Sequence, residues 1–365
     1  MLNFTHFKRI DWTVLIPVAL LVFLGLSTLY TITLNVENPD MTLFNKQVIF
    51  SISGFILLFL FSFLDYRRLK SYAIAFYILA CLSLILVLFF GTTIRGTTGW
   101  FTFFGFGLQP VEFAKFVLVI VLAYFYESKQ NKLSWKSMFL YSGLITLVPV
   151  FLALLQPDFG SAFILIIIWF SFFAITKMKK KYLFFLIIGF VILSIFIWHF
   201  VLIDYQKDRI LTFIDPMRDP LGKGYNVRQS IIATGSGGLI GRGLGLGTQS
   251  QLHFLPEIET DFIFSSICET LGFLGATLMI ILYAILFLRL IFIIKKTRDY
   301  FGIFIIFGFG IIFFSQTLIN MGMNIGIFPV TGLPLPFVSY GGSFLLMCLV
   351  SVGLIQSAIT HQKVL

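Results

Sequence analysis

The sequence predicts an all-α polytopic membrane protein with about ten transmembrane helices and a large extracellular loop between helices 7 and 8. Of its 365 residues, 58% are hydrophobic and only 12% are charged, and the mean hydropathy is +0.99. A soluble domain usually has about 25% charged residues, so this chain has too few polar side chains to cover a water-soluble surface. Its apolar runs are continuous rather than alternating, which favours helices over a β-barrel.

Each apolar run is long enough to cross a bilayer, because a membrane-spanning helix needs about 20 apolar residues. The first run starts near Trp12 and has no small-residue cleavage site, so it is expected to be retained and not removed as a signal peptide. We expect a single membrane domain over residues 1–365, with spans at roughly 12–34, 45–64, 70–90, 110–127, 137–155, 158–176, 182–203, 262–294, 301–325 and 341–360.

The distribution of cations predicts the orientation. Most of the 26 Lys and Arg residues lie in alternate short loops and near both ends of the chain. By the positive-inside rule those loops and both termini are cytoplasmic, and the loop 204–261 faces outward. The net charge of +10 then reflects orientation and not nucleic-acid binding. The three cysteines lie inside apolar runs, so no disulfide framework is indicated.

The segment 204–261 is the one long polar interruption, and it ends with Asp261 at the start of an apolar run. A carboxylate that is partly desolvated at a membrane boundary can act as a general base. The alternative is that Thr260 and Asp261 form a helix N-cap. Glu257 would face the same way as Asp261 in a helix. The segment holds or adjoins eight of the 16 acidic residues: Asp204, Asp208, Asp215, Asp219, Glu257, Glu259, Asp261 and Glu269.

Two further sets of acidic and basic residues lie at span boundaries. Glu112 and Lys115 open the fourth span three residues apart, so they share a helix face and can pair. They are either a functional pair or an interfacial one, with Lys115 snorkelling to the surface. Asp158 follows Pro157 at the start of a span, where it is either functional or an N-cap.

Outward cations are candidates for holding an anionic, phosphate-bearing substrate, although each alone can be a solvated loop charge. The four that we single out are Arg95, Lys46, Arg209 and Arg242. The glycine-rich run 235–247 lacks the strand of a dinucleotide site, so it is either tight backbone packing or a groove for phosphate. The segment 324–343 has three prolines and several glycines, which predicts a re-entrant or broken-helix element.

Several of these motifs resemble the RodA/FtsW family of shape, elongation, division and sporulation (SEDS) proteins. The motifs are LQPVEFAK at 108–115, QPDFGSA at 156–162, the run from DPMRDPLGKGY through QSQLHFLPEIETDFIF, and GIFPVTGLPLPFVSYGGS. The resemblance covers nearly the whole chain, and the opening Asp-Trp and the middle run resemble the RodA branch more than FtsW. After ETDFIF many relatives carry two adjacent acids, whereas here Glu269 is followed by Thr270.

The resemblance implies ten spans with both termini in the cytoplasm of a bacterium. It also implies an enzyme that polymerises lipid II, the undecaprenyl-pyrophosphate-linked disaccharide-pentapeptide, into peptidoglycan strands during elongation. The implied partners are a class B penicillin-binding protein and other elongation-complex membrane proteins. The family's essential aspartate maps onto Asp261, its fourth-span pair onto Glu112 and Lys115, and its PE and QPD motifs onto Glu257 and Asp158.

We therefore expect Asp261 to act as a general base, with outward cations or a divalent ion (Mg²⁺ or Mn²⁺) stabilising the leaving pyrophosphate. The sequence identifies no metal ligands and implies no organic cofactor. A lipid-linked precursor flippase or transporter is the alternative function, but it would need a polar path across the bilayer midplane. A scaffold for a cell-wall complex would leave the charged residues unexplained.

Overall fold

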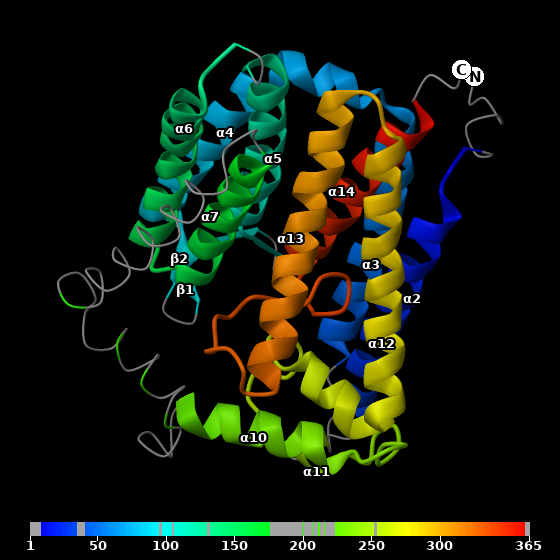
Figure 1. The fold of residues 1–365 in the computed structure, drawn as a ribbon. Helices are drawn as coiled ribbons and strands as arrows, with labels where there is room; N and C mark the ends of the chain where they lie inside the picture. Colours follow the sequence, from blue (N-terminus) through cyan, green and yellow to red (C-terminus); the bar gives the residue numbers. More distant parts are fainter. Residues whose placement is uncertain are drawn as a thin grey trace.

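The computed structural model describes residues 9–34, 41–94, 97–103, 106–129, 132–175, 223–251 and 254–361, and four single positions between 199 and 215. Figure 1 shows long helices packed side by side along a common direction. They are α2 (Trp12–Leu34), α3 (Thr42–Phe63), α4 (Leu69–Phe90), α5 (Pro110–Lys129), α6 (Trp135–Leu155), α7 (Phe159–Ala174), α12 (Ile263–Lys296), α13 (Tyr300–Asn324) and α14 (Gly342–Thr360).

Each predicted span within the described ranges coincides with one of these helices, so the predicted fold class is confirmed. Seven of the described helices are long and apolar enough to cross a membrane. The other two are α7, which is apolar but has only 16 residues, and α5, which carries charged side chains near both ends. The predicted seventh span at 182–203, and most of the loop before residue 223, lie outside the described residues.

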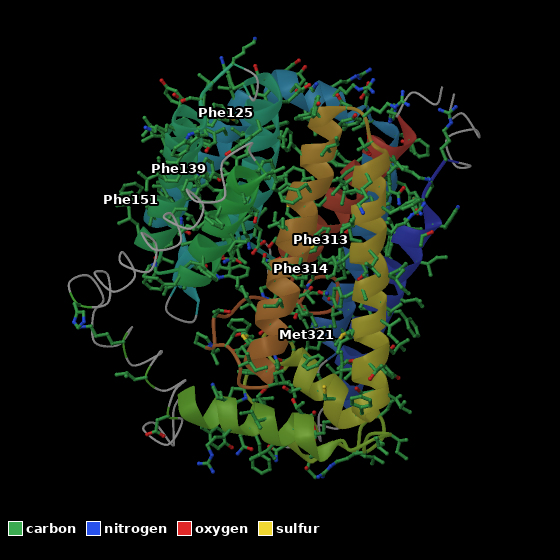
Figure 2. All side chains as sticks on the ribbon, in the orientation of Figure 1. Phe125, Phe139, Phe151, Phe313, Phe314 and Met321 are labelled. Atoms are coloured by element: carbon green, nitrogen blue, oxygen red, sulfur yellow. The ribbon has the colours of Figure 1, made fainter. Side chains whose placement is uncertain are left out.

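Helix pairs form the bundle, with α13 near its centre. α2 packs on α12, α3 on α14, α4 on α5 and α6 on α7, while α13 contacts α5, α7, α12 and α14. Figure 2 shows the side chains on these helices, and several aromatic rings pack against one another between helices. Phe116 stacks on Phe309 with ring centroids 5.1 Å apart, and Phe172 stacks on Phe304 at 5.8 Å. Gly308 of α13 lies directly beneath the Phe172 ring, where a side chain would not fit.

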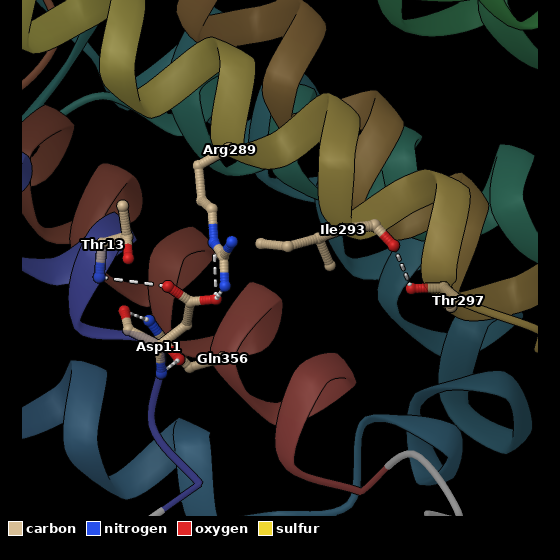
Figure 3. A network of polar contacts seen from close by, with 6 residues as sticks. All are labelled: Asp11, Thr13, Arg289, Ile293, Thr297 and Gln356. Atoms are coloured by element: carbon tan, nitrogen blue, oxygen red, sulfur yellow. Dashed lines mark hydrogen bonds and ion pairs between the residues drawn. The ribbon is translucent and has the colours of Figure 1, made fainter.

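The start of α2 and the end of α14 lie at the same end of the bundle. Asp11 and Gln356 exchange two hydrogen bonds, and the Asp11 carboxylate also accepts from Arg289 of α12 at 2.6 Å (Figure 3). Because the start of α2 and the end of α14 lie at the same end of the bundle, the arrangement agrees with an even number of spans. The short helices α10 (Lys223–Ser236) and α11 (Thr248–Gln251) lie across the opposite end of the bundle (Figure 1).

A small antiparallel sheet follows α4, and the sequence did not predict it. Its strands are β1 (Thr92–Ile94), β2 (Thr97–Phe103) and β3 (Phe106–Leu108), in the order β1-β2-β3. Gly107 lies against the Trp100 ring, so the glycine lets neighbouring strands approach closely.

The segment 325–341 is irregular and packs inside the protein, as its prolines and glycines predict. Leu333, Leu335 and Phe337 are buried, and the Phe337 ring lies 4.9 Å from that of Phe313 on α13. The Tyr283 hydroxyl of α12 donates to the Pro336 carbonyl. Non-helical backbone at membrane depth needs such protein partners, because lipid offers its polar groups none.

Candidate functional site

Asp261 lies in a turn immediately before α12. The N-cap of α12 is Phe262, and no side chain caps it by a hydrogen bond, so the alternative that Thr260 and Asp261 form the N-cap is wrong. The Asp261 side chain is half-buried, and a Cβ atom placed on Gly332 would lie 3.8 Å from its Oδ2. Its carboxylate therefore lies against the irregular segment, at the point where a glycine leaves room.

The turn is closed by the Glu257 carbonyl, which accepts hydrogen bonds from three following amides. The N–H groups of Thr260, Asp261 and Phe262 donate to it at 3.2, 3.0 and 3.3 Å. Glu257 itself has a φ of 60°, in the left-handed region that a non-glycine residue seldom adopts. Such strain persists only where surrounding contacts enforce it, and it often accompanies functional sites. Glu257 thus sets the backbone that carries Asp261.

Glu112 and Lys115 form an ion pair in the first turns of α5. Glu112 Oε1 and Lys115 Nζ are 2.6 Å apart, and the two residues are 5% and 1% exposed. The predicted pairing is confirmed, and snorkelling of Lys115 to the surface is excluded by its burial. A buried pair is costly to open, because either charge alone would be left without solvent.

Asp158 is the N-cap of α7, as one of its two sequence interpretations predicted. Its Oδ1 accepts from the Ser161 N–H at 2.9 Å, and its Oδ2 accepts from Gln109 Nε2 at 3.3 Å. Gln109 directly precedes α5, and its carbonyl accepts from the Glu112 N–H at 3.1 Å. Gln109 therefore links Asp158 to the helix that carries the buried ion pair.

The irregular segment contacts both the start of α7, which Asp158 caps, and Asp261. Gly160, two residues after Asp158, packs so closely on Thr331 that an added Cβ would lie 2.8 Å from the Thr331 carbonyl oxygen. Asp261 lies against the next residue, Gly332. Thr331 and Gly332 thus lie against the start of α7 and against Asp261, and Gln109 links Asp158 to the helix that carries the Glu112–Lys115 pair. Sequence analysis singled out the four charged residues but not Gln109.

A phenol lies beside the turn. The Tyr340 N–H donates to the Glu259 carbonyl at 2.8 Å. Burial raises the pKa of the Tyr340 hydroxyl, and the neighbouring Glu259 carboxylate raises this pKa further. The backbone of Tyr340 holds the turn at Glu259.

The profile of the FtsW/RodA/SpoVE cell cycle proteins matches residues 9–364. The chain belongs to this family. It is 34% identical to a probable peptidoglycan glycosyltransferase FtsW of Geobacter metallireducens, over 99% of this chain and 98% of that one. It is 33% identical to the peptidoglycan glycosyltransferase MrdB of Escherichia coli, over 96% and 94% of the two chains. The chain is therefore a multi-pass membrane enzyme of the glycosyltransferase class.

Solved structures agree with this family assignment. A chain of a peptidoglycan synthase complex, described as coordinating polymerization and crosslinking, matches with a TM-score of 0.82 and 33% identity over 97% of this chain and 98% of that one. The rod shape determining protein RodA of Thermus thermophilus matches with a TM-score of 0.73 and 28% identity, over the same shares of the two chains.

In this member of the FtsW/RodA/SpoVE family, two of the four singled-out cations, Lys46 and Arg242, lie among the described residues. Lys46 is half-buried near the start of α3, beside Gln47, whose amide donates to the Ser339 carbonyl of the irregular segment at 3.2 Å. Arg242 is exposed and holds its own loop, donating to Thr248 Oγ1 at 3.0 Å. Arg95 and Arg209 lie outside the described residues.

The glycine-rich run 235–247 packs tightly against a break in α12. Gly272 interrupts that helix with a φ of 66°, and an added Cβ there would lie 2.2 Å from the Gly241 nitrogen. The N–H of Arg242 donates to the Glu269 carbonyl at 2.9 Å. Tight backbone packing, one of the two predicted interpretations, is thus confirmed. No contact of the described residues tests the alternative of a phosphate groove.

Glu269 is fully buried, and its carboxylate organises the chain around α11. It accepts from the N–H groups of Gln249 and Ser250 at 2.9 and 3.0 Å, and from the Ser250 hydroxyl at 2.5 Å. These bonds attach α11 to α12. These hydrogen bonds explain why an acidic residue is buried at position 269, and they require no second acidic residue next to it.

Proposed function

We propose that this enzyme polymerises lipid II into peptidoglycan glycan strands at the outer face of the bacterial cytoplasmic membrane, during cell elongation. The observation that carries the proposal is the placement of Asp261, a half-buried carboxylate whose backbone is held on several sides and which lies against Gly332. The relatives named peptidoglycan glycosyltransferase support the substrate class.

In the proposed reaction Asp261 is the general base. Its carboxylate takes the proton from the 4-hydroxyl of the acceptor N-acetylglucosamine, and that oxygen attacks the anomeric carbon of the donor N-acetylmuramic acid. The bond from this carbon to the pyrophosphate breaks, and undecaprenyl pyrophosphate leaves with the electron pair. A neutral hydroxyl is a weak nucleophile, so a positioned base contributes about 10²- to 10⁴-fold. The proton then passes from Asp261 to water.

The neighbouring charged residues have supporting roles in this proposal. Asp158 caps the start of α7, the Glu112–Lys115 pair lies in the first turns of α5, and the Glu257 carbonyl holds the turn that carries Asp261. Because Lys115 is 1% exposed and bonded to Glu112, it touches the pyrophosphate only if the pair opens. Contacts to the anionic leaving group are assigned instead to the outward cations Arg95, Lys46, Arg209 and Arg242.

The divalent cation expected from the sequence stays a prediction. Among the described residues no three His, Cys, Asp or Glu side chains gather into a possible metal site. The proposed steps above therefore run through no metal ion.

The proposed partner is a class B penicillin-binding protein, which would cross-link the strands that this enzyme makes, together with other membrane proteins of the elongation complex. The similarity to a chain of a complex that coordinates polymerization and crosslinking supports this partner. Both termini are assigned to the cytoplasm, because most cations lie in the loops on their side.

The test of the proposed base is polymerisation of labelled lipid II by the purified full chain, alone and with its candidate partner. Asp261→Asn is nearly isosteric and removes the base, so the rate should fall by about 10²-fold or more. The matched control is Asp65→Asn, which makes the same chemical change where Asp65 caps a 3-10 turn, a role that Asn fills equally well. A wild-type rate for Asp261→Asn would refute the assignment.

Placing lipid II only in the leaflet that faces the loops around α10 and α11 separates polymerisation from transport. An enzyme whose site faces that leaflet forms glycan strands there without moving its substrate across the bilayer. A flippase would instead move lipid II to the other leaflet and form no strands. Observing translocation without polymer would favour the alternative function.

A further inference from the structure

Two buried asparagines of α13 hold the backbone of Asp261. The Nδ2 atoms of Asn320 and Asn324 both donate to the Asp261 carbonyl oxygen, at 3.0 and 2.9 Å. Both asparagines are 0% exposed in a predominantly apolar helix. A buried amide costs about 1–3 kcal/mol unless it is hydrogen-bonded, so a pair converging on one carbonyl calls for an explanation.

The same two side chains also reach the elements on either side of Asp261. Asn320 Nδ2 donates to the Leu333 carbonyl at 2.8 Å, next to Gly332. Asn324 Oδ1 accepts from the Ser265 N–H at 3.1 Å and from the Ser265 hydroxyl at 2.6 Å, in the first turn of α12. The pair therefore joins the turn before α12, the start of α12 and the irregular segment.

The carbonyls of the two residues before Asp261 are also held from outside the turn. The Tyr340 N–H donates to the Glu259 carbonyl at 2.8 Å, and the Ser339 hydroxyl donates to the Thr260 carbonyl at 2.6 Å. Three consecutive carbonyls thus accept hydrogen bonds from α13 and the irregular segment. Because a backbone held in this way cannot shift or rotate freely, the Cα atom of Asp261 has a fixed position.

We propose that Asn320 and Asn324 are positioning residues for Asp261. This inference rests on the proposed function, in which the Asp261 carboxylate removes a proton from the acceptor sugar. They touch no reacting atom; they fix where the carboxylate stands relative to Gly332 and to the sugar that occupies the site. A misplacement of about 1 Å costs on the order of 10²-fold in rate, so removing one of the two donors should lower turnover clearly.

The test is Asn324→Ala in the purified full chain, assayed by polymerisation of labelled lipid II beside wild type. We expect kcat to fall about 10- to 100-fold while KM changes less than about 3-fold, because a displaced base slows the chemical step and leaves substrate contacts in place. The matched control is Ser315→Ala on the same helix, whose hydroxyl bonds only to carbonyls of α13 itself. It should keep the wild-type kcat.

A double-mutant cycle separates positioning from a general structural role. In the Asp261→Asn background, Asn324→Ala should lower the residual rate less than about 2-fold, because its effect is exerted through the missing carboxylate. A purely structural role would reduce the rate by the same factor in both backgrounds, and that result would overturn the inference.

Should Asn324→Ala not fold, Asn320→Ala answers the same question, because it leaves the Asn324–Ser265 bonds intact.

The outcomes distinguish this inference from the proposed function. If Asp261→Asn is impaired while Asn320→Ala and Asn324→Ala both turn over at the wild-type rate, the positioning role is wrong and the general base stands. If Asp261→Asn itself works at the wild-type rate, the general base is wrong, and the positioning role falls with it.

Discussion

The Lys115 ammonium and the Glu112 carboxylate form their ion pair inside the bundle, where neither can reach water. Their spacing on the helix made the pairing predictable. Their burial was not predictable, because it depends on how α5 packs against α4, α7, α13 and α14. At the scale of single residues, the consequence is that each charge depends on the other.

Removing one partner of this pair should destabilise the protein more than removing both. Lys115→Met leaves the Glu112 carboxylate buried without a counterion, so the free energy of unfolding should fall by about 3–5 kcal/mol. Lys115→Met combined with Glu112→Leu should recover most of that loss. Thermal unfolding in detergent, followed by intrinsic fluorescence, measures both variants. A single variant as stable as wild type would show that Glu112 finds another partner or a proton.

Activity of the double variant adds information about function. If the pair only holds α5 in place, the refilled core should restore polymerisation of lipid II along with stability. If the double variant is stable but turns over at least 10-fold more slowly, the charges themselves act in the reaction, as the family resemblance implies. The two outcomes are read from the same purified samples.

At the scale of elements, α12 is two helices joined at Gly272 and held together by the glycine-rich run. Backbone bonds lie on both sides of the break. Before it, Arg242 and Gly243 donate to the carbonyls of Glu269 and Thr270 at 2.9 and 3.1 Å; after it, Phe273 and Leu274 donate to the carbonyls of Gly238 and Leu239 at 2.9 and 3.1 Å. The sequence showed an apolar run of unusual length and a cluster of glycines. Only the folded structure shows that the glycine-rich run packs against the break at Gly272.

Gly272→Ala should therefore be strongly destabilising. A φ of 66° alone costs an Ala about 1–3 kcal/mol, and the added Cβ would meet the Gly241 nitrogen at 2.2 Å. The matched control is Gly235→Ala in α10, where nothing lies within 4 Å of the added Cβ and Ala is the better helix former. We expect the melting temperature to drop by several degrees for Gly272→Ala and not for Gly235→Ala. Equal melting temperatures would contradict this account of the break.

At the scale of the whole molecule, the bundle has two distinct ends. One end carries the Asp11–Arg289–Gln356 network, which joins the residue before α2 to α12 and α14 (Figure 3). The other carries α10, α11 and the turn of Asp261. In the proposed orientation, which rests on the cation distribution, the first end faces the cytoplasm and the second faces the outer surface.

Single introduced cysteines test this orientation. Ile240→Cys lies at a 78% exposed position of the glycine-rich run, and Lys132→Cys lies at an exposed position between α5 and α6. In intact cells a membrane-impermeant maleimide should label the first and not the second, and permeabilised cells should show both. The unmodified chain is the control, since Cys268 and Cys348 are buried and Cys81 is half-buried. The reverse pattern would invert the proposed orientation.

The sequence alone determined the class of the protein, the positions of the spans and the charged residues at their boundaries. Apolar length, cation placement and helix spacing are local properties, so Glu112, Lys115, Asp158 and Asp261 could all be found from them. The family resemblance added the reaction. The sequence left open whether Asp158 caps a helix, and the position at which α7 starts was enough to decide it.

Tertiary structure alone decided what surrounds Asp261. Asn320 and Asn324 reach its carbonyl across about 60 residues of sequence, and Gly332 approaches it from another segment. The spacing of the two asparagines in an apolar helix was a signal of a buried polar contact, but it could not name the partner. Hydrogen bonds between distant segments depend on how helices pack, and packing is a property of the folded molecule that no local pattern contains.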